Sequence, residues 1–221
     1  MGSVARPKVH TDDLRDRLLD EAIAIVAERG IGALSVRDVA HAAGTSTTAV
    51  YSLFGNKEGL SRAVQVRAFE SFTEAETAIS TSPDAAADLG SLGTAYIGWA
   101  LANPRLYELM FGDALTGIEP TPESLDAAAR AIAPLRDGVA RAIETGAFRQ
   151  ADVGTVAASL WAQVHGMAQL LLSGHYPADA DPIAAGEAII EGWRRGILPP
   201  DVEPLGLSLI HISEPTRLGM I

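Results

Sequence analysis

One segment near the N-terminus constrains the fold of this chain most, because it carries helix caps on both sides of a glycine turn. From Ser35 to Leu60 it reads SVRDVAHAAGTSTTAVYSLFGNKEGL. Ser35 predicts the start of a short helix whose apolar residues recur at helical spacing. Gly44 predicts a turn, and Ser46 predicts the cap of a second short helix. The inward positions of that helix are Val50 and Phe54. The segment therefore has the outline of a helix-turn-helix.

The second helix of this motif carries no charge and presents compact side chains outward. Its outward positions are Thr47, Thr48, Tyr51 and Ser52. A helix that faces only water usually carries Glu, Lys and Arg, whereas a helix entering a major groove about 12 Å wide favours compact hydrogen-bonding groups. Arg37 and Lys57 flank it as candidate phosphate contacts, and Asn56 predicts the next cap. The pattern favours DNA recognition, and the alternative is a helical hairpin of an unrelated α-helical protein.

This segment and the amphipathic helix before it resemble the DNA-binding half of the tetracycline repressor (TetR) family. The earlier helix repeats apolar residues at helical spacing, namely Leu14, Leu18, Ala22 and Ile25. The resemblance covers about 11–67 and implies an all-α fold, in which a three-helix DNA-binding domain precedes a helical domain for ligand binding and dimerisation. It implies DNA contacts by Arg37, Thr45, Ser46, Thr47, Thr48, Tyr51, Ser52 and Lys57. Ser52 and Leu53 depart from the residues common at those positions in the family.

Charge is divided unevenly along the chain, whose net charge is -11. Residues 1–67 carry nine Lys or Arg against eight Asp or Glu, and the remainder carries eight against twenty. The nearly neutral N-terminal part can approach phosphate, while the acidic remainder of the chain is repelled from DNA. Arg6 and Lys8, in a flexible arm over 1–10, either add DNA contacts or belong to a solvated tail.

The composition of the chain limits which other classes of protein it can belong to. The chain has 221 residues, of which 48% are hydrophobic, and lacks a charge-free apolar run long enough to span a membrane. Its first twenty residues show no signal-peptide pattern, and it contains no cysteine, so disulfides, thiolate metal sites and thiol catalysis are excluded. We expect a cytoplasmic protein without a metal or a cofactor. No His-Glu-x-x-His, Gly-x-Ser-x-Gly or phosphate-loop motif is present, so we expect no catalytic residues.

Glycine, proline and capping residues divide the rest of the chain into helices. About nine are expected in all. After the head, expected to cover 11–57, a helical body over 58–200 contains helices at about 57–81, 84–103, 105–111, 123–145, 152–173 and 181–198. Pro134 predicts a kink in the helix over 123–145.

Helix 152–173 is apolar on two sides, which predicts two packing partners. One side carries Val153, Val156, Leu160, Val164, Met167 and Leu171, and the other carries Trp161, His165, Ala168 and Leu172. Helix 181–198 offers Ile183, Ile190, Trp193 and Ile197. We expect these two helices to form a four-helix homodimer interface. The alternative is a monomer in which both helices are buried.

The body also resembles a C-terminal domain type named for Trp, His and Gly, found in some members of the family. The resemblance rests on Trp161-x-x-x-His165-Gly166 and on the segments 103–107 and 110–112. We expect a cavity for a small apolar or amphipathic effector, lined by Tyr96, Trp99, Tyr107, Phe111, Trp161 and His165. His165 alternatively satisfies a protein group, and the aromatic stripe alternatively belongs to the core.

The last residues, 207–221, break with the composition before them. Leu207 to Arg217 resemble the conceptual translation of a transposase-type sequencing adapter. We expect this segment to be foreign and the native ending after about Gly206 to be missing, and the alternative is a genuine tail.

The sequence therefore predicts a homodimeric transcription regulator, most simply a repressor, that binds a palindromic operator in double-stranded DNA and responds to an effector. The alternative is a helical ligand-binding or scaffold dimer without DNA readout, and a helical enzyme ranks third. Activation in place of repression stays open.

Overall fold

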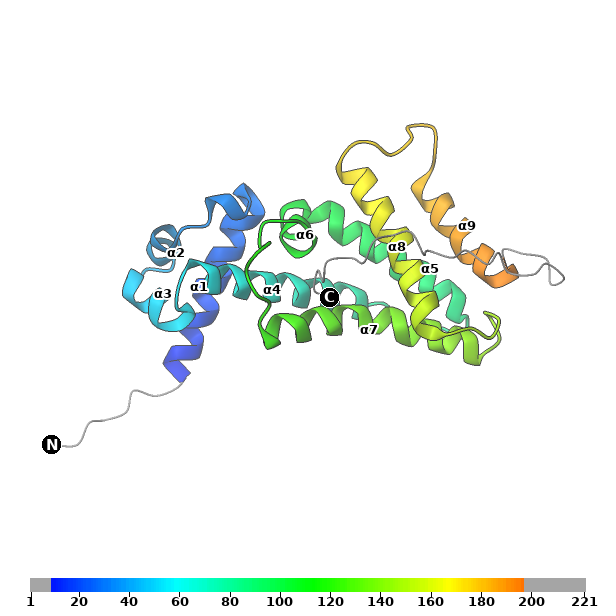
Figure 1. Cartoon of the computed structure of the whole chain (residues 1–221), viewed down its shortest axis with the longest axis horizontal. Coiled ribbons are helices and arrows are strands. Elements are labelled where there is room, and N and C mark those ends of the chain that lie inside the picture. Colours follow the sequence, from blue (N-terminus) through cyan, green and yellow to red (C-terminus); the bar gives the residue numbers. More distant parts are fainter. Residues whose placement is uncertain (1–8, 197–221) are drawn as a thin grey trace.

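The structure is a computed structural model that describes residues 9–196, all of whose regular elements are helical. Most of the N-terminal arm and the segment 207–221 lie outside the described residues. The α-helices, seen in Figure 1, are α1 (Val9–Arg29), α2 (Val36–Ala42), α3 (Thr47–Phe54), α4 (Lys57–Thr77), α5 (Ala85–Ala102), α6 (Pro104–Phe111), α7 (Pro122–Glu144), α8 (Val153–Leu172) and α9 (Pro182–Arg195). The predicted all-α fold is confirmed.

Local capping sets the boundaries of the three short connections in the head. The Ser35 Oγ accepts a hydrogen bond from the Asp38 amide at 3.2 Å, and the Ser46 Oγ accepts one from the Ala49 amide at 3.3 Å. The Asn56 Oδ1 accepts one from the Gly59 amide at 2.7 Å. Each bond satisfies one of the amides that a helix leaves unpaired at its start. All three caps occur where the sequence predicts them.

The turn between α2 and α3 depends on Gly44, whose φ of 65° lies in the left-handed region that favours glycine. Behind this turn, Val39 and Val50 are fully buried and Phe54 is nearly so. The Arg15 guanidinium lies over the Phe54 ring, 5.3 Å from its centroid. These contacts hold α2 and α3 against α1 in the bundle at one end of the molecule (Figure 1).

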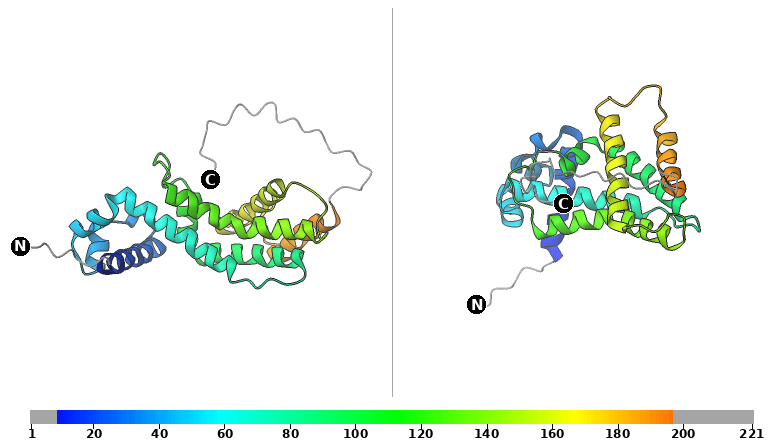
Figure 2. Two further views of the ribbon diagram at one scale, coloured as in Figure 1. Left: turned by 90° about the horizontal axis from the view of Figure 1, so that it is seen from below. Right: turned by 45° about the vertical axis from the view of Figure 1, so that its right-hand side comes forward.

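Helix α4 joins the head to the body without interruption, as Figure 2 shows from two sides. Near its start, Leu60 and Val64 are fully buried, in the part of α4 that packs on α1. Further along, Phe69 packs edge-on against Phe111 of α6, with ring centroids 5.8 Å apart. A single hydrophobic cluster runs from α1 through α4 to α5, α6 and α7. The boundary predicted at residue 57 coincides with the start of α4, and the division into two domains stays a prediction.

The body packs α4, α5 and α7 together, with α8 crossing them and α9 lying on α5 (Figures 1 and 2). A second hydrophobic cluster lies at the end of the body far from the head, around Leu89, Val139, Ile143 and Phe148. Helix α9 contributes Ile190 and Trp193 to its edge but contains no fully buried residue. The body is therefore most loosely packed where α9 lies.

The helix boundaries differ from the sequence prediction in three places. A short 3-10 turn over Ile31–Ala33, which the sequence did not predict, links α1 to α2. Helix α4 ends at Thr77 and not near residue 81. The last described helix ends at Arg195, where Gly196 adopts a φ of 78°. Helix α7 continues through Pro134 as one helix.

Candidate DNA-contacting surface and ligand cavity

Helix α3 presents its uncharged face to solvent at the tip of the head. Thr47, Thr48 and Ser52 are exposed, and the Tyr51 side chain is 52% exposed. Thr45 in the turn is half-buried and Ser46, the cap, is exposed. The opposite side of α3 carries the buried Val50 and Phe54. The predicted recognition residues therefore share one accessible face of one helix.

Two cations flank this face. Arg37 in the first turn of α2 and Lys57 in the first turn of α4 are both exposed, and within residues 9–196 neither forms an ion pair. Lys57 directly follows the Asn56 cap and is the first residue of α4. Helix N-termini and cations are the groups that bind phosphate oxygens in DNA complexes. The eight predicted DNA-contacting residues thus gather around α3.

Gly59 is a residue of this tip that the sequence analysis did not single out. A Cβ added to Gly59 would collide with the carbonyl oxygen of Phe54. The last turn of α3 therefore approaches the first turn of α4 so closely that only glycine fits. This approach fixes Lys57 relative to the exposed face of α3.

A buried polar contact ties α4 to the body just beyond the tip. Arg62 donates from Nη1 to the Gln65 Oε1 at 3.0 Å and from Nη2 to the Ile118 carbonyl. Gln65 in turn donates from Nε2 to the carbonyl oxygens of Leu109 and Met110, at 3.3 and 3.5 Å. The last turn of α6 and the loop after it are thus attached to α4, and α6 also packs on α1.

Three of the predicted effector residues form a hydrogen-bonded triangle. The Tyr107 hydroxyl lies 2.7 Å from the His165 Nδ1, the Tyr96 hydroxyl lies 2.9 Å from the same nitrogen, and the two hydroxyls are 3.0 Å apart. A neutral imidazole that accepts at Nδ1 fits this geometry, because each hydroxyl can then donate once. The alternative reading of His165, that it satisfies protein groups, agrees with these bonds.

Burial controls the ionisation of this triangle. It lowers the pKa of His165, which keeps the imidazole neutral, and raises the pKa of Tyr96 to about 12. Burial also raises the pKa of Tyr107 far above its usual range. All three groups are therefore uncharged near neutral pH.

The other three predicted effector residues pack around the triangle. The Trp99 ring lies 5.3 Å from Phe72 and its Nε1 donates to the Ser71 Oγ at 3.3 Å. Phe111 lies 5.0 Å from the His165 ring, and Trp161 lies 6.2 Å from Phe111. The six aromatic residues thus form one cluster among α5, α6 and α8. Their contact with an effector stays a prediction.

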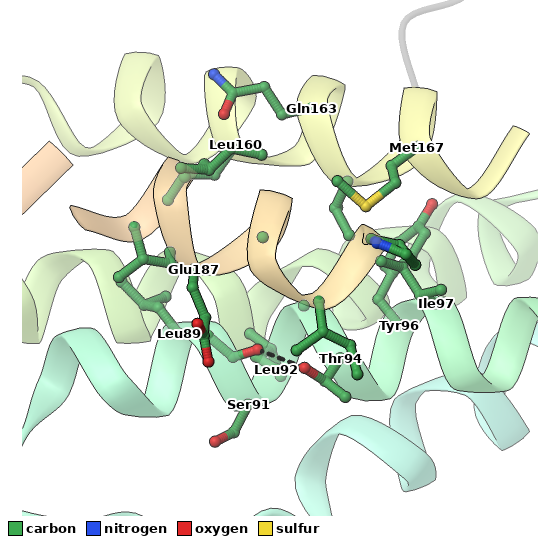
Figure 3. Close-up of a pocket in the computed structure, with 18 of the residues that line it drawn as sticks. Leu89, Ser91, Leu92, Thr94, Tyr96, Ile97, Leu160, Gln163, Met167 and Glu187 are labelled. Atoms are coloured by element: carbon green, nitrogen blue, oxygen red, sulfur yellow. Dashed lines mark hydrogen bonds between the residues drawn. The ribbon is translucent and has the colours of Figure 1, made fainter. Parts of the chain in front are cut away.

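A cavity of about 660 Å³ lies beside this cluster, among α5, α8 and α9 (Figure 3). Its volume falls in the range of small-molecule sites. Side chains of Leu92, Ile97, Leu160 and Met167 form apolar walls, and Tyr96 is the member of the predicted effector set that lines it. The exposed Ser91, Thr94 and Glu187 lie at its rim, where it reaches solvent.

Small residues on α5 create this space. Gly90, Gly93 and Gly98 line the cavity, and a Cβ at Gly93 would still lie 3.9 Å from the Val164 Cγ2. Each glycine inside a helix lowers the stability of that helix by about 1 kcal/mol relative to alanine. The three glycines of α5 therefore keep the cavity open at the expense of the stability of α5. One further lining residue, Glu76 of α4, has a buried carboxyl group. None of these four residues was predicted from the sequence.

Helices α8 and α9 leave some apolar side chains exposed, although Ile183 of α9 also lines the cavity. Leu170 is 44% exposed and Ile183 is 63% exposed, and Ala158 and Ala162 lie exposed on α8. On the inward side of α8, Val156, Leu160 and Met167 are buried as expected for the core stripe. Of the residues predicted for α9, Ile190 packs toward the body and Ile197 lies outside the described residues.

Comparison with known proteins identifies the head and the body together. Residues 18–64 match the family described as bacterial regulatory proteins, tetR family. Residues 89–192 match the family described as tetracyclin repressor-like, C-terminal domain, and the two matches span more than half of the chain. The chain belongs to the TetR family. It is accordingly a DNA-binding transcriptional regulator with a helix-turn-helix head, as its sequence predicts.

Three known proteins are similar to this chain in sequence or in structure. The HTH-type transcriptional regulator Rv1816 of Mycobacterium tuberculosis is 27% identical over 183 residues, which cover 69% of this chain and 77% of that protein. The HTH-type transcriptional repressor ComR of Escherichia coli is 40% identical over 70 residues, 32% of each chain. A solved structure from Rhodococcus sp. RHA1, of a protein described as of unknown function, superposes with a TM-score of 0.72 at 26% identity. The superposition covers 82% of this chain and 95% of that one.

Among residues 9–196, no helix is both long and apolar enough to cross a membrane. Within the same residues, no group of three or more His, Asp or Glu side chains has the arrangement of a metal site.

Proposed function

We propose that this TetR-family regulator is a ligand-responsive repressor that binds a palindromic operator as a homodimer. The observation that carries the proposal is the face of α3, where Thr47, Thr48, Tyr51 and Ser52 are exposed and are flanked along the sequence by the exposed cations Arg37 and Lys57. Compact hydrogen-bonding groups suit the base edges of the major groove, and cations suit its phosphates. We assign base contacts to Thr48 and Tyr51 and a phosphate contact to Lys57.

Dimerisation through α8 and α9 is supported by the apolar side chains that these helices leave exposed, Leu170 and Ile183 among them. Ala158 and Ala162 on α8 allow a second helix to approach closely. A two-fold axis there would give two copies of α3, which bind successive major grooves when they lie about 34 to 36 Å apart. The operator would then be a palindrome whose half-sites repeat after one turn.

Ligand response is supported by the contacts between the cavity and the head. Helix α4 contributes to both, and Arg62 and Gln65 attach it to the end of α6, which itself packs on α1. A ligand that separates α5 from α8 and α9 would shift this assembly and change the spacing of the two heads. Induction follows if the ligand binds more tightly to the conformation that fits DNA poorly.

Two further expectations complete the proposal. We expect no catalytic activity, since the family consists of transcriptional regulators and the polar groups of Tyr96, Tyr107 and His165 are bonded to one another. We expect the protein to act in the cytoplasm, where bacterial DNA is accessible. The body also resembles the Trp-His-Gly type, and that subtype stays a prediction.

The test is selection of binding sites from random duplex DNA at about 150 mM salt, together with the mass of the protein in solution. A recovered palindrome with half-sites one turn apart, bound by a dimer, would support the proposal. A folded dimer that enriches no sequence would overturn it and favour the alternative, a ligand-binding or scaffold dimer without DNA readout.

A further inference from the structure

Glu76 has a carboxyl group that is buried where residues 9–196 offer it no partner. It lies in the last full turn of α4, is 5% exposed, and lines the cavity. Its Oε2 is enclosed and accepts no hydrogen bond from any residue of the range 9–196. A buried carboxyl without a partner is costly, and native proteins rarely retain one without a function. A ligand in the cavity is the partner that remains.

The charged and titratable groups around the cavity leave Glu76 without a cation. Helix α5 offers it Tyr96, whose hydroxyl already belongs to the triangle with Tyr107 and His165. The lining residues of α7 and α8 do not titrate; they are Leu135, Leu160, Gln163, Val164, Met167 and Leu171.

Helix α9 contributes three charged residues to the lining, of which one is basic. That residue, Arg194, pairs with Asp84 at 2.8 Å outside the cavity. Glu191 pairs with Arg195, and Glu187 is exposed at the rim. The net charge available to a ligand in the cavity is therefore negative.

The rest of the lining determines which kind of ligand skeleton fits the cavity. Lining residues of α5 extend from Ala86 to Leu101, a distance of about 22 Å along the helix axis. Most of the side chains along this length are aliphatic, and the three glycines of α5 keep the space between them open. An elongated apolar chain fits such a cavity better than a compact polar molecule.

We propose that the cavity binds a cationic amphiphile, with its apolar chain along α5 and a protonated amine paired with the Glu76 carboxylate. This inference rests on the proposed function, which supplies the effector. An ammonium group provides the charge-assisted hydrogen bond that Glu76 lacks. A fatty acid carboxylate is disfavoured, because the one basic residue of the lining, Arg194, is already paired with Asp84 and leaves such an anion without a cation in the cavity.

The ionisation of Glu76 makes this pairing measurable through proton release and through the pH dependence of ligand affinity. Burial raises the pKa of the Glu76 carboxyl to about 8, so the empty site is mostly protonated at pH 7. An alkylamine keeps its proton at that pH, as lysine does. Binding therefore drives a proton from Glu76 into solvent, and the affinity for the amine rises from pH 6 to 8 and levels off above.

The experiment is calorimetric titration of the full chain with decylamine, decanol and decanoate, each below its micelle concentration. We expect decylamine to bind at least about tenfold more tightly than decanoate. At pH 7 we expect release of nearly one proton per bound amine, measured from the buffer dependence of the heat. The Glu76→Gln variant should lose about tenfold or more in affinity for decylamine, retain binding of decanol, and release no proton.

Two variants separate recognition of the amine from other effects. Glu74→Gln removes an exposed carboxylate from the same helix and should leave the titrations unchanged. Gly93→Met should fill the cavity and weaken binding of every probe, because Gly93 faces Val164 across the open space. Glu76→Gln replaces a buried carboxyl group by an amide of nearly the same shape, so this variant should unfold no earlier than the parent protein.

The outcomes distinguish this inference from the proposed function. Equal affinity for decanoate and decylamine, or unchanged amine binding in Glu76→Gln, overturns the assignment of Glu76. Operator release by decanol or decanoate but not by decylamine also overturns it, while the protein remains a ligand-responsive regulator. Tight amine binding with proton release but without any effect on operator binding supports the cation site and contradicts the regulatory proposal.

Discussion

Replacing Tyr51 by phenylalanine removes a single hydroxyl and so tests whether α3 is the helix that contacts DNA bases. The Tyr51 side chain is 52% exposed, and its hydroxyl forms no hydrogen bond within residues 9–196. Loss of this hydroxyl should therefore change the free energy of unfolding by less than about 0.5 kcal/mol. Any larger effect on DNA binding would then come from a lost contact with DNA.

The expected loss of affinity follows from the two heads of the dimer. A neutral hydrogen bond contributes about 1 kcal/mol. Two heads would lose about 2 kcal/mol together, which weakens operator binding about 30-fold. Fluorescence anisotropy with the selected operator, at fixed salt, measures this change.

The matched control is Tyr176→Phe, which removes a hydroxyl from the connection between α8 and α9, far from the head (Figure 1). It should leave operator affinity unchanged. An unchanged affinity in Tyr51→Phe, and again after Thr48→Ala is added to it, would refute the recognition-helix assignment.

Three further predictions concern the tip and the body. Lys57→Ala should weaken binding about equally on all sequences and lower the slope of log affinity against log salt by about one per head; an unchanged slope contradicts the phosphate contact. Gly59→Ala should lower the free energy of unfolding by about 1 to 3 kcal/mol, because its Cβ meets the Phe54 carbonyl. Gly32→Ala, which meets open space, is its control in denaturant titrations. For Asp88, hydrogen bonds from Arg141 and from the Ser82 amide lower the pKa to about 2. Its stabilising effect is thus present above about pH 3.9 and lost toward pH 2. Asp88→Asn should flatten the fall of the melting temperature in that window, and a parallel fall would contradict this.

Sequence patterns predicted the head well because its structure depends on local interactions. Each cap acts within three residues, and the left-handed turn at Gly44 needs only the residue type that allows it. The 3-10 turn over 31–33 lacks such a signal, since its glycine and apolar residues fit a loop equally well. The predicted positions of helix ends were least accurate where the helix lacks a strong cap, as at Thr77.

The cavity was harder to predict because it depends on how distant helices pack. Of the six predicted effector residues, Tyr96 lines the cavity, whereas Tyr107 and His165 form bonds with each other that sequence spacing cannot reveal. One signal was nevertheless present. The buried stripe of α4 runs through Ala68 and Phe72, and one more turn at the same spacing reaches Glu76. A carboxylate in line with a core stripe indicates a buried charge, and the glycines of α5 indicate missing volume.

The continuity of α4 has a mechanical consequence. Lys57 at the DNA-facing tip and Glu76 at the cavity belong to one helix, separated by nineteen residues and therefore by about 29 Å. A rigid rod of that length that pivots by only about 5° at the cavity displaces its far end by about 2.5 Å. Such a displacement is comparable to the length of a hydrogen bond, so a modest rotation in the body is enough to move a lysine out of reach of a phosphate.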